Sequence, residues 1–330
     1  MRSRDSIPTT TGGCSRREFP SKRQERNLRY TPVAHMIPRR RVFRLRLPSR
    51  ILDLGQRTLV MGVLNVTPDS FSDGGKFLDP ESAIERAFAV ERAGADILDI
   101  GGESTRPGSV GTPASEELDR ILPILEALRG RLKIPVSVDT RRASVAEIAL
   151  RAGAELLNDV SGLKSDPKIA EVAARHRVPL ILMHMRGEPR TMQSGGFARD
   201  VTQDVLHGLR KSVAVARKAG VAKSQIILDP GIGFGKSFAQ NFEMLQKLPQ
   251  LAKLGYPLLV GTSRKGFLGA TLARDGKPAA PEERIWGTAA TVAASILQGA
   301  HILRVHDVEE MVQVASVADC VVDPKRGPKN

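Results

Sequence analysis

From residue 58 onward, short apolar runs rich in β-branched residues alternate with longer stretches whose apolar side chains recur with helical spacing. The short runs are typical of buried strands and the longer stretches of amphipathic helices. Strands are predicted at Leu59–Val66, Ala95–Gly101, Ile134–Asp139, Leu156–Val160, Leu180–Met185, Ile226–Asp229, Leu258–Gly261 and Ile302–Val305. Helices are predicted at Glu81–Ala93, Ser115–Arg129, Ser144–Ala152, Pro167–Arg175, Arg199–Ala219, Asn241–Leu251 and Arg284–Gln298.

This alternation of strand and helix requires parallel strands and places the chain in the α/β class. Eight near-continuously apolar strands over about 250 residues fit a (β/α)8 TIM barrel better than an open doubly wound sheet, which is the alternative. The sequence therefore predicts a TIM barrel.

Polar side chains stand at or just past the end of each predicted strand. They are Asn65, Glu103 with Thr105 and Arg106, Asp139, Asn158, His184, Asp229, Ser263 with Arg264 and Lys265, and Arg304 with His306. In a barrel these ends converge on one mouth, where catalytic residues lie. A single residue such as Asp139 is more often a cap of the next helix, so only the complete set indicates a functional site.

The composition, with 41% apolar and 26% charged residues among 330, excludes disorder throughout the chain. The net charge of +14 is unevenly distributed, because residues 1–50 contain fourteen basic and three acidic residues. The first 50 residues also have no apolar period that would bury a core. We therefore expect a basic, disordered N-terminal extension over residues 1–50 and a nearly balanced barrel domain over residues 51–330.

Three interpretations of the extension remain open. An organellar leader is Arg-rich and poor in acids, but Pro20, Pro32 and Pro38 disfavour the amphipathic helix that it would form. A nucleic-acid-binding arm needs only the charge. An extension without specific function, from a start upstream of Met36 or Met61, is favoured, and no nucleic-acid partner is expected.

Several other sites and locations are disfavoured. Cys14 and Cys320 lie at opposite ends of the chain, which indicates a reducing cytoplasm, and no apolar run is long enough to cross a membrane. Pro230 stands where the phosphate-binding loop G-x-x-x-x-G-K-[ST] requires its first glycine, and the G-x-G-x-x-G spacing is also missed. The histidines show no zinc-binding spacing, so no zinc site is expected.

Two long motifs and several shorter ones are more specific. They are Met61–Gly75, Asp99–Gly108, Ser137–Thr140, Asn158–Gly162, Leu182–Met185, Leu228–Lys236, Gly261–Lys265 and Arg304–Asp307. Over roughly residues 58–310 the chain resembles the dihydropteroate synthase family of folate biosynthesis. The resemblance implies a transferase that condenses (7,8-dihydropterin-6-yl)methyl diphosphate with 4-aminobenzoate, with the help of Mg²⁺, and it suggests a homodimer.

The resemblance also implies roles for individual residues. Asp139, Asn158, Asp229 and Lys265 would hold the pterin, with Phe234 and Met183 as apolar walls. Asn65 would contact Mg²⁺, while Arg304 and His306 would bind the diphosphate and stabilise it as it leaves. Thr105, Arg106 and Ser263 would complete the 4-aminobenzoate side. Independently of the resemblance, the loops at 67–75 and 102–108 are longer than most connections, which predicts lids over the mouth, with solvated surface loops as the alternative.

Two other functions fit the same fold. A barrel that binds methyltetrahydrofolate for cobalamin-dependent methyl transfer would share the pterin residues, but it would not need the full first loop or Ser263-Arg264-Lys265. A non-catalytic paralogue would lack residues of the loops or of the diphosphate site. None of those that can be placed is missing, so the synthase is the favoured function.

Overall fold

The computed structural model describes residues 40–67, 80–104, 109, 111–187, 192 and 196–328. Its main sheet has eight parallel strands in the order β8-β7-β6-β5-β4-β3-β10-β9. The strands are β3 (Leu59–Asn65), β4 (Ile97–Gly101), β5 (Val136–Asp139), β6 (Leu156–Asp159), β7 (Leu180–Met183), β8 (Ile226–Asp229), β9 (Leu259–Val260) and β10 (Ile302–Val305). A parallel bridge between Leu228 and Leu258 joins the two ends of the sheet. The predicted TIM barrel is confirmed.

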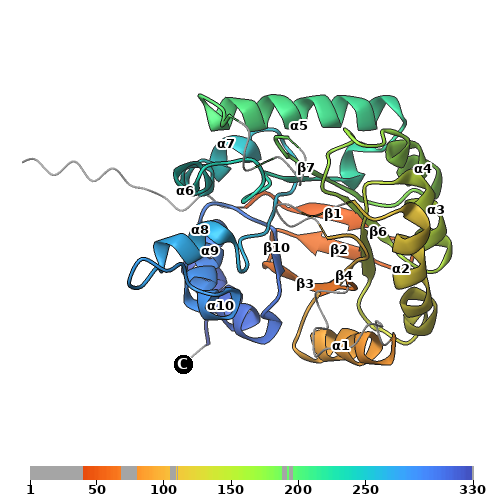
Figure 1. Ribbon diagram of the computed structural model, residues 1–330, viewed down its shortest axis with the longest axis horizontal. Coiled ribbons are helices and arrows are strands. Elements are labelled where there is room, and N and C mark those ends of the chain that lie inside the picture. Colours follow the sequence, from red (N-terminus) through yellow and green to blue (C-terminus); the bar gives the residue numbers. More distant parts are fainter. Residues whose placement is uncertain are drawn as a thin grey trace, which may run out of the picture. The chain divides into compact units, whose positions relative to one another are not determined.

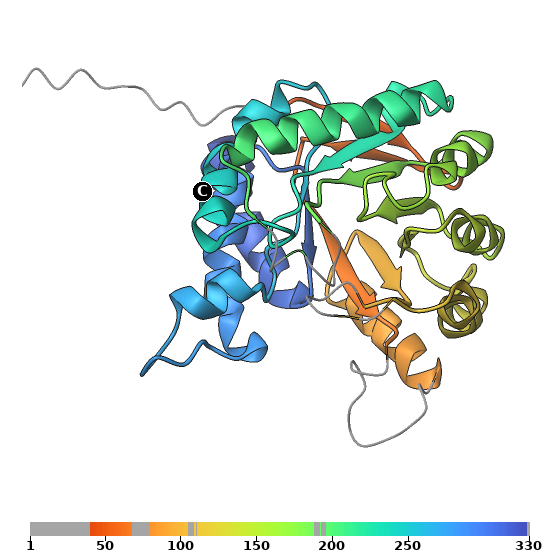
Figure 2. The same cartoon turned by 45° about the horizontal axis from the view of Figure 1, so that its top comes forward.

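Helices surround these strands, as Figures 1 and 2 show. They are α1 (Pro80–Arg92), α2 (Ala114–Leu128), α3 (Ala143–Arg151), α4 (Lys168–His176), α5 (Val201–Lys218), α6 (Phe238–Gln246), α7 (Leu248–Ala252), α8 (Gly266–Thr271), α9 (Ile285–Leu297) and α10 (Val308–Val322). The predicted helix Asn241–Leu251 is in fact two helices, because Pro249 lies in the first turn of α7 and begins a new helix there. Helices α8 and α10 were not predicted.

A hairpin of β1 (Phe43–Arg46) and β2 (Ile51–Leu54) precedes the barrel and pairs antiparallel. Leu45, Leu47 and Leu54 are buried and pack with the apolar residues that begin the barrel strands. Those residues are Leu59, Met61, Ile97, Leu156, Ile181, Ile227, Leu259 and Ile302. The hairpin therefore closes the end of the barrel at which the strands start.

The hairpin corrects one expectation. Disorder was predicted up to residue 50, but residues 43–50 are folded, so the predicted boundary between residues 50 and 51 falls inside a compact element. The physical reason is the alternation in Phe43-Arg44-Leu45-Arg46, which directs one leucine inward and the arginines outward. The high arginine content concealed this strand period. Residues 1–39 lie outside the described residues.

Truncation of Leu54 to alanine should destabilise the barrel. Leu54 is fully buried against the strand starts, and loss of a buried leucine side chain typically costs about 2–5 kcal/mol. Val42→Ala is the matched control, because Val42 lies beside the same hairpin and is 55% exposed. Urea unfolding of both variants measures the difference, and equal stability of the two would show that the hairpin does not form part of the core.

Among the described residues, no helix is long and apolar enough to cross a membrane.

Candidate active site

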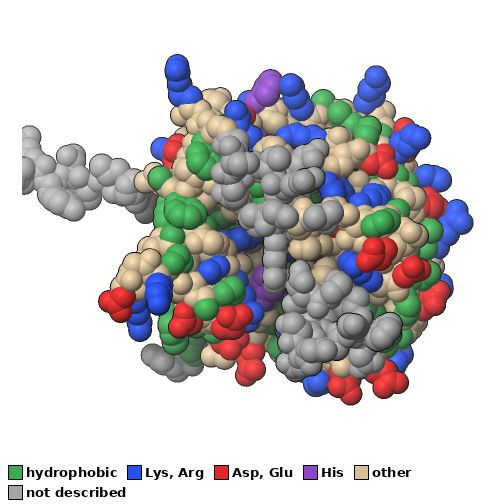
Figure 3. All heavy atoms as spheres, viewed as in Figure 1, with side chains coloured by type: hydrophobic (Ala, Val, Ile, Leu, Met, Phe, Trp, Pro, Cys, Tyr) green, Lys and Arg blue, Asp and Glu red, His purple; other side chains and the backbone are tan. Residues whose placement is uncertain are grey.

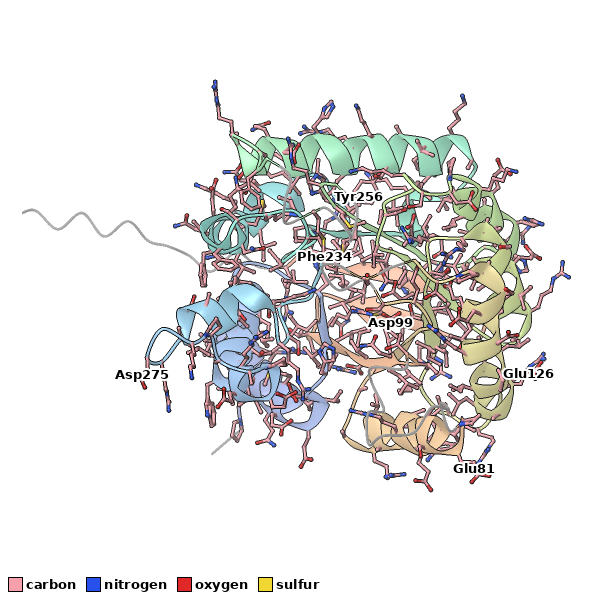
Figure 4. All side chains as sticks on the ribbon, in the orientation of Figure 1. Glu81, Asp99, Glu126, Phe234, Tyr256 and Asp275 are labelled. Carbon is pink, nitrogen blue, oxygen red and sulfur yellow. The ribbon has the colours of Figure 1, made fainter. Side chains whose placement is uncertain are left out.

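The carboxyl ends of the barrel strands line one cavity. Its lining residues are Asn158, Val160, Met183, Asp229, Gly231, Ile232, Phe234, Gly261, Ser263, Lys265, Arg304 and His306. Phe234 and Asp99 lie within the ring of helices, whereas Glu81, Glu126 and Asp275 lie at its outside (Figure 4). Most of the predicted site residues thus converge, although they come from segments far apart in the sequence.

Strand register explains one side of this site. Asn65, Gly101, Asp139 and Asn158 are register partners across the adjacent strands β3, β4, β5 and β6. They form one row at the carboxyl ends of these strands. Gly101 contributes no side chain to this row, so it leaves space between Asn65 and Asp139.

Arg304 is held by two buried carboxylates. Its Nε donates to Oδ2 of Asp99 at 2.6 Å, and its Nη2 donates to Oδ2 of Asp139 at 2.8 Å. Burial alone would lower the pKa of Arg304, but the two carboxylates more than offset this, and the pKa is raised. The guanidinium is therefore a fixed positive charge in the mouth, with an orientation set by its two partners.

Sequence reasoning did not assign a role to Asp99. This residue is completely buried in the middle of β4, and its Oδ2 also accepts a hydrogen bond from Nδ2 of Asn158 at 3.0 Å. Asp99 thus orients a cavity-lining amide and a cavity-lining guanidinium at once. In the sequence, Asp99 stands between the apolar residues Leu98 and Ile100 of a buried strand. Because charged side chains are rarely buried without a partner, this position could have indicated its role.

Burial raises the pKa of Asp139, and the nearby Asp99 carboxylate raises it further, while Arg304 acts in the opposite direction. Asp139 is only 9% exposed and does not line the cavity itself. Its observed partner is Arg304, which donates to its Oδ2. Its predicted contact with the pterin stays a prediction.

Asp229 and Lys265 face the same cavity. Oδ1 of Asp229 accepts the backbone N–H of Gly231 at 2.7 Å, and burial raises the pKa of Asp229 to about 6. Nζ of Lys265 lies 4.1 Å from the centre of the Phe234 ring, and burial lowers the pKa of Lys265 to about 8. At neutral pH the cavity thus offers a mostly ionised acceptor and a charged donor beside an aromatic wall.

The loop after β8 carries Phe234 and needs glycine at two positions. Gly231 has a φ of +66°, and a Cβ there would lie 1.9 Å from the carbonyl oxygen of His184. A Cβ at Gly233 would lie 2.9 Å from Cδ of Lys265. The loop therefore passes closely beside β7 and Lys265, which fixes Phe234 against the lysine.

Lys236 is a second residue that sequence reasoning missed. Its side chain is buried, and Nζ donates to the carbonyl oxygens of Gly231 at 2.8 Å and Phe234 at 3.2 Å. Nζ also lies 3.3 Å from Nδ1 of His184. Because these partners lie along the loop after β8, the buried ammonium group of Lys236 stabilises the conformation of this loop. In the sequence, Lys236 is part of a pattern that resembles a phosphate-binding loop but does not match it. This pattern gives no indication that its ammonium group binds carbonyl oxygens of its own loop.

Lys236 predicts a pH dependence of stability. Burial lowers the pKa of Lys236 to about 7 from its ordinary value of 10.5, so between these values the unfolded chain binds the proton more tightly. Stability of the wild type should then rise, relative to Lys236→Met, as pH increases from about 7 toward 10. Urea unfolding of both proteins across this range measures the effect, and a constant difference would contradict it.

Ser263 and His306 form a hydrogen-bonded pair at the mouth. Oγ of Ser263 accepts the backbone N–H of His306 at 3.2 Å and lies 3.0 Å from its Nδ1. Burial, followed by the charges of Arg304, Arg264 and Lys265, lowers the pKa of His306 to about 3. The imidazole is therefore neutral at physiological pH. With the Ser263 hydroxyl donating to Nδ1, Nε2 carries the ring proton and is an N–H donor.

The second loop is anchored by a cluster of charges at its base. Glu103 pairs with Arg141 at 2.8 Å and with Arg142 at 3.0 Å, and Arg142 also pairs with the buried Glu117. Burial opposes ionisation of Glu103, but the two arginines more than offset it and lower the pKa. Thr105 and Arg106, which were predicted for the 4-aminobenzoate side, lie outside the described residues, as does most of the first loop.

Asn65 lies at the end of β3, half-buried, and does not line the cavity. Its Oδ1 lies close to Gly101 on the side of Asp139. Within the described part of the chain, no group of three or more His, Cys, Asp or Glu side chains is placed to hold a metal ion. The donor set fits an Mg²⁺ ion that takes one amide oxygen from the protein and its remaining ligands from phosphate and water.

Comparison with known proteins places the chain in a family. Residues 61–306 match the family of pterin binding enzymes. The dihydropteroate synthase of Synechocystis sp. is 51% identical over 271 residues, which cover 82% of this chain and 92% of the relative.

Solved structures are similar as well. A dihydropteroate synthase of Xanthomonas albilineans with 4-aminobenzoic acid is 41% identical with a TM-score of 0.78, over 86% of this chain and 99% of the other. The Yersinia pestis enzyme in complex with a sulfonamide drug is 42% identical with a TM-score of 0.78, over the same shares of the two chains. With its barrel, its polar mouth and these relatives, the chain belongs to the dihydropteroate synthase family of pterin-binding enzymes.

Proposed function

We propose that the mouth cavity binds both substrates of a dihydropteroate synthase. As a member of its family, the protein is a transferase of folate biosynthesis. It condenses (7,8-dihydropterin-6-yl)methyl diphosphate with 4-aminobenzoate to give 7,8-dihydropteroate and diphosphate. The observation that carries the residue assignment is the convergence of Asp229, Lys265, Arg304 and His306 on one cavity.

The pterin would enter with its amino-pyrimidinone edge toward Asp229. That edge presents N–H donors, and a carboxylate accepts two of them at once. Asp229 is oriented by the N–H of Gly231 and is mostly ionised at neutral pH. Lys265 would donate to the ring carbonyl and N5, while Phe234 and Met183 contact the flat faces. Asn158 lines the same cavity and adds an amide whose orientation Asp99 sets.

The diphosphate would lie against Arg304 and His306. Arg304 supplies a permanent positive charge, and neutral His306 supplies an N–H donor whose ring is fixed by Ser263. The negative charge of a bound diphosphate favours the protonated imidazole. His306 would therefore bind the group more strongly as charge accumulates on it.

Asn65 is the residue that we assign to Mg²⁺. When bound, the ion would neutralise charge on the diphosphate oxygens. Asn65 would contribute one ligand from the end of β3, next to the diphosphate region. The remaining ligands would be phosphate oxygens and water.

The 4-aminobenzoate would bind on the outer side of the pterin. Ser263 lines the cavity beside His306, and we assign Thr105 and Arg106 of the second loop to the same side. The anchored base of that loop, Glu103 with Arg141 and Arg142, would hold its start in place. Because relatives are solved with 4-aminobenzoic acid and with a sulfonamide drug, we expect sulfonamides to compete with 4-aminobenzoate.

The reaction breaks the bond between the pterin methylene carbon and the diphosphate oxygen and forms a bond from that carbon to the aryl amine. Arg304 and His306 stabilise the charge that develops on the leaving oxygen. The pterin ring, held by Asp229 and Lys265, shares the positive charge of the methylene carbon. The aryl amine is a nucleophile as the neutral base and loses its proton after attack, so the proposal requires no dedicated general base.

Purified protein, Mg²⁺, the pterin diphosphate and 4-aminobenzoate provide the test. We expect dihydropteroate and diphosphate to form in equal amounts, measured by chromatography and a coupled diphosphate assay. Absence of both products would contradict the function.

Oligomeric state and location also belong to the proposal. A homodimer is supported by exposed apolar side chains on α9 and α10, namely Trp286 at 79%, Val317 at 67% and Val321 at 52% exposure. Light scattering of the purified protein measures the mass directly. The cytoplasmic location expected from the two separate cysteines stays a prediction.

A further inference from the structure

A second cavity lies at the end of the barrel opposite the mouth. Its volume is about 260 Å³, and its lining includes Arg40, Arg41, Phe43, Lys253, Tyr256 and His301. Tyr256 comes shortly before β9 and His301 directly before β10, so both stand where strands begin. This basal cavity shares no lining residue with the mouth.

Positive charges gather around the basal cavity. The guanidinium of Arg41 lies 5.4 Å from the centre of the Phe43 ring, and Nζ of Lys223 lies 5.4 Å from that of Tyr256. A Cβ on Gly255 would lie 3.6 Å from Nη1 of Arg41 and 3.8 Å from Nζ of Lys223, so the two cations approach one point. Within the residues that the structure describes, no acidic side chain lines the cavity. The cavity is thus suited to an anion.

Arg40 lines the cavity and is held in place by hydrogen bonds of its guanidinium. Its Nη1 donates to Oγ1 of Thr58 at 2.5 Å and to the carbonyl oxygen of Ala300 at 3.1 Å, and its Nη2 pairs with Asp319. The side chain of Arg40 is only 2% exposed, so these bonds fix the chain beside Arg41 rather than offer a donor to the cavity.

His301 holds this arrangement without adding charge. Its Nδ1 accepts the backbone N–H of Leu258 at 3.1 Å, so its Nε2 carries the proton and donates to the carbonyl oxygen of Arg41 at 3.0 Å. Burial lowers the pKa of His301 to about 4, and the ring is neutral. It also packs edge-on against Phe43, with ring centres 5.3 Å apart. The positions of Arg41 and Phe43 are therefore built into the fold.

We propose that the basal cavity binds a small aromatic carboxylate. Its ring would pack against Phe43 and Tyr256, and its carboxylate would be held by Arg41 and Lys253, the exposed cations of the cavity lining. Inorganic phosphate shares the anionic chemistry but makes no use of the aromatic side chains. A neutral aromatic amide has the ring without the charge. Both serve as probes that separate the two contributions.

Fluorine NMR offers a local readout, because the chain contains only two tyrosines, Tyr30 and Tyr256. Full-length protein labelled with 3-fluorotyrosine should show two signals, and Tyr30→Phe leaves that of Tyr256. We expect 2-naphthoate to shift the Tyr256 signal saturably. We expect 2-naphthamide and phosphate to shift it only at concentrations at least tenfold higher. No saturable shift with 2-naphthoate, or equal potency of either control probe, would overturn the proposal.

Variants locate the contact. Arg41→Gln combined with Lys253→Gln should weaken 2-naphthoate binding at least tenfold. Arg129→Gln combined with Lys168→Gln removes two exposed cations, one directly after α2 and one at the start of α4, and should leave the affinity unchanged. Since the basal residues lie outside the mouth, both double variants should still form dihydropteroate. Equal affinity of the two double variants would contradict the assigned site.

Discussion

Replacement of Asp229 by asparagine is expected to weaken binding of the pterin diphosphate at least about a hundredfold. A carboxylate accepts two N–H donors of the pterin edge, whereas an amide offers one acceptor and presents N–H groups to the other donor. Hydrogen bonds to charged groups contribute about 1.5–3 kcal/mol each, and a hundredfold loss corresponds to about 2.7 kcal/mol. The substitution keeps the size of the side chain, and its Oδ1 still accepts from Gly231.

Isothermal titration calorimetry with the pterin diphosphate measures this loss of affinity. The Arg106→Ala variant serves as the comparison. Arg106 is assigned to the 4-aminobenzoate side, so its variant should bind the pterin diphosphate normally but turn over slowly. Lys265→Ala should resemble Asp229→Asn in its loss of pterin affinity. Equal pterin affinity of the Asp229 and Arg106 variants would contradict this division of the cavity.

The same carboxylate predicts a pH dependence of binding. Burial raises the pKa of Asp229 to about 6 from its ordinary value of 3.8, so pterin affinity should fall as pH drops below about 6. The contribution of Asp229 to stability has the opposite sign, because the folded protein binds its proton more tightly. Relative to Asp229→Asn, the stability of the wild type should therefore fall as pH rises from about 4 to 6. Titrations at several pH values should show the affinity change in the wild type and none in Asp229→Asn.

Replacement of Arg304 by methionine should have the second large effect, on both turnover and stability. The variant loses the charge that we assign to the leaving diphosphate, and we expect at least about a hundredfold loss of kcat/KM, as for removal of a single oxyanion donor. It also leaves Asp99 and Asp139 buried beside each other without their cation. Breaking a buried ion pair in this way typically costs about 3–5 kcal/mol.

Arg151→Met is the matched control for stability. Arg151 pairs with Glu147 on the same helix, but its side chain is 71% exposed, and such surface pairs contribute about 0–1 kcal/mol. Arg304→Lys keeps the charge but loses the fork that reaches both carboxylates, so it should fall between wild type and Arg304→Met. Unfolding of the Arg304 and Arg151 methionine variants at the same denaturant concentration would show that Arg304 is not a structural cation.

Much of the fold was predictable because its signals are local. Each barrel strand is a short apolar run, and the polar residues at the strand ends, such as Asn158 and Asp229, stand in fixed positions relative to those runs. Their convergence follows from the geometry of parallel strands. The hairpin β1–β2 was missed because Arg44 and Arg46 alternate with the residues that it buries. Helix α10 followed the last predicted strand and was overlooked despite the helical spacing of Val308, Met311 and Ala315.

The contacts inside the mouth were not predictable in the same way. Arg304 and Asp139 are 165 positions apart, and nothing local to either residue indicates that they pair. Lys236 resembled part of a phosphate-binding loop, yet its ammonium binds carbonyl oxygens of its own loop. Asp99 acts through Arg304 and Asn158. These roles depend on how strands and loops meet in space, so they became visible only in three dimensions.

The charges of the chain are distributed unevenly between its N-terminal residues and the mouth of the barrel. The formal charge of +14 belongs mainly to the first 50 residues, while the mouth balances Arg304 and Lys265 against Asp99, Asp139 and Asp229. Figure 3 shows basic and histidine side chains near the middle of the face seen there. The diphosphate gains negative charge as it leaves, and this charge would develop next to Arg304 and His306. Their positive charge and N–H donors would stabilise the leaving group.

A crystal structure of the protein with the pterin diphosphate and Mg²⁺ tests the central claim most directly. We predict the amino-pyrimidinone edge on Asp229, the ring between Phe234 and Met183, and the diphosphate beside Arg304 and His306. A pterin bound elsewhere, or bound in this cavity with its diphosphate directed away from Arg304, would contradict the assignment of the mouth.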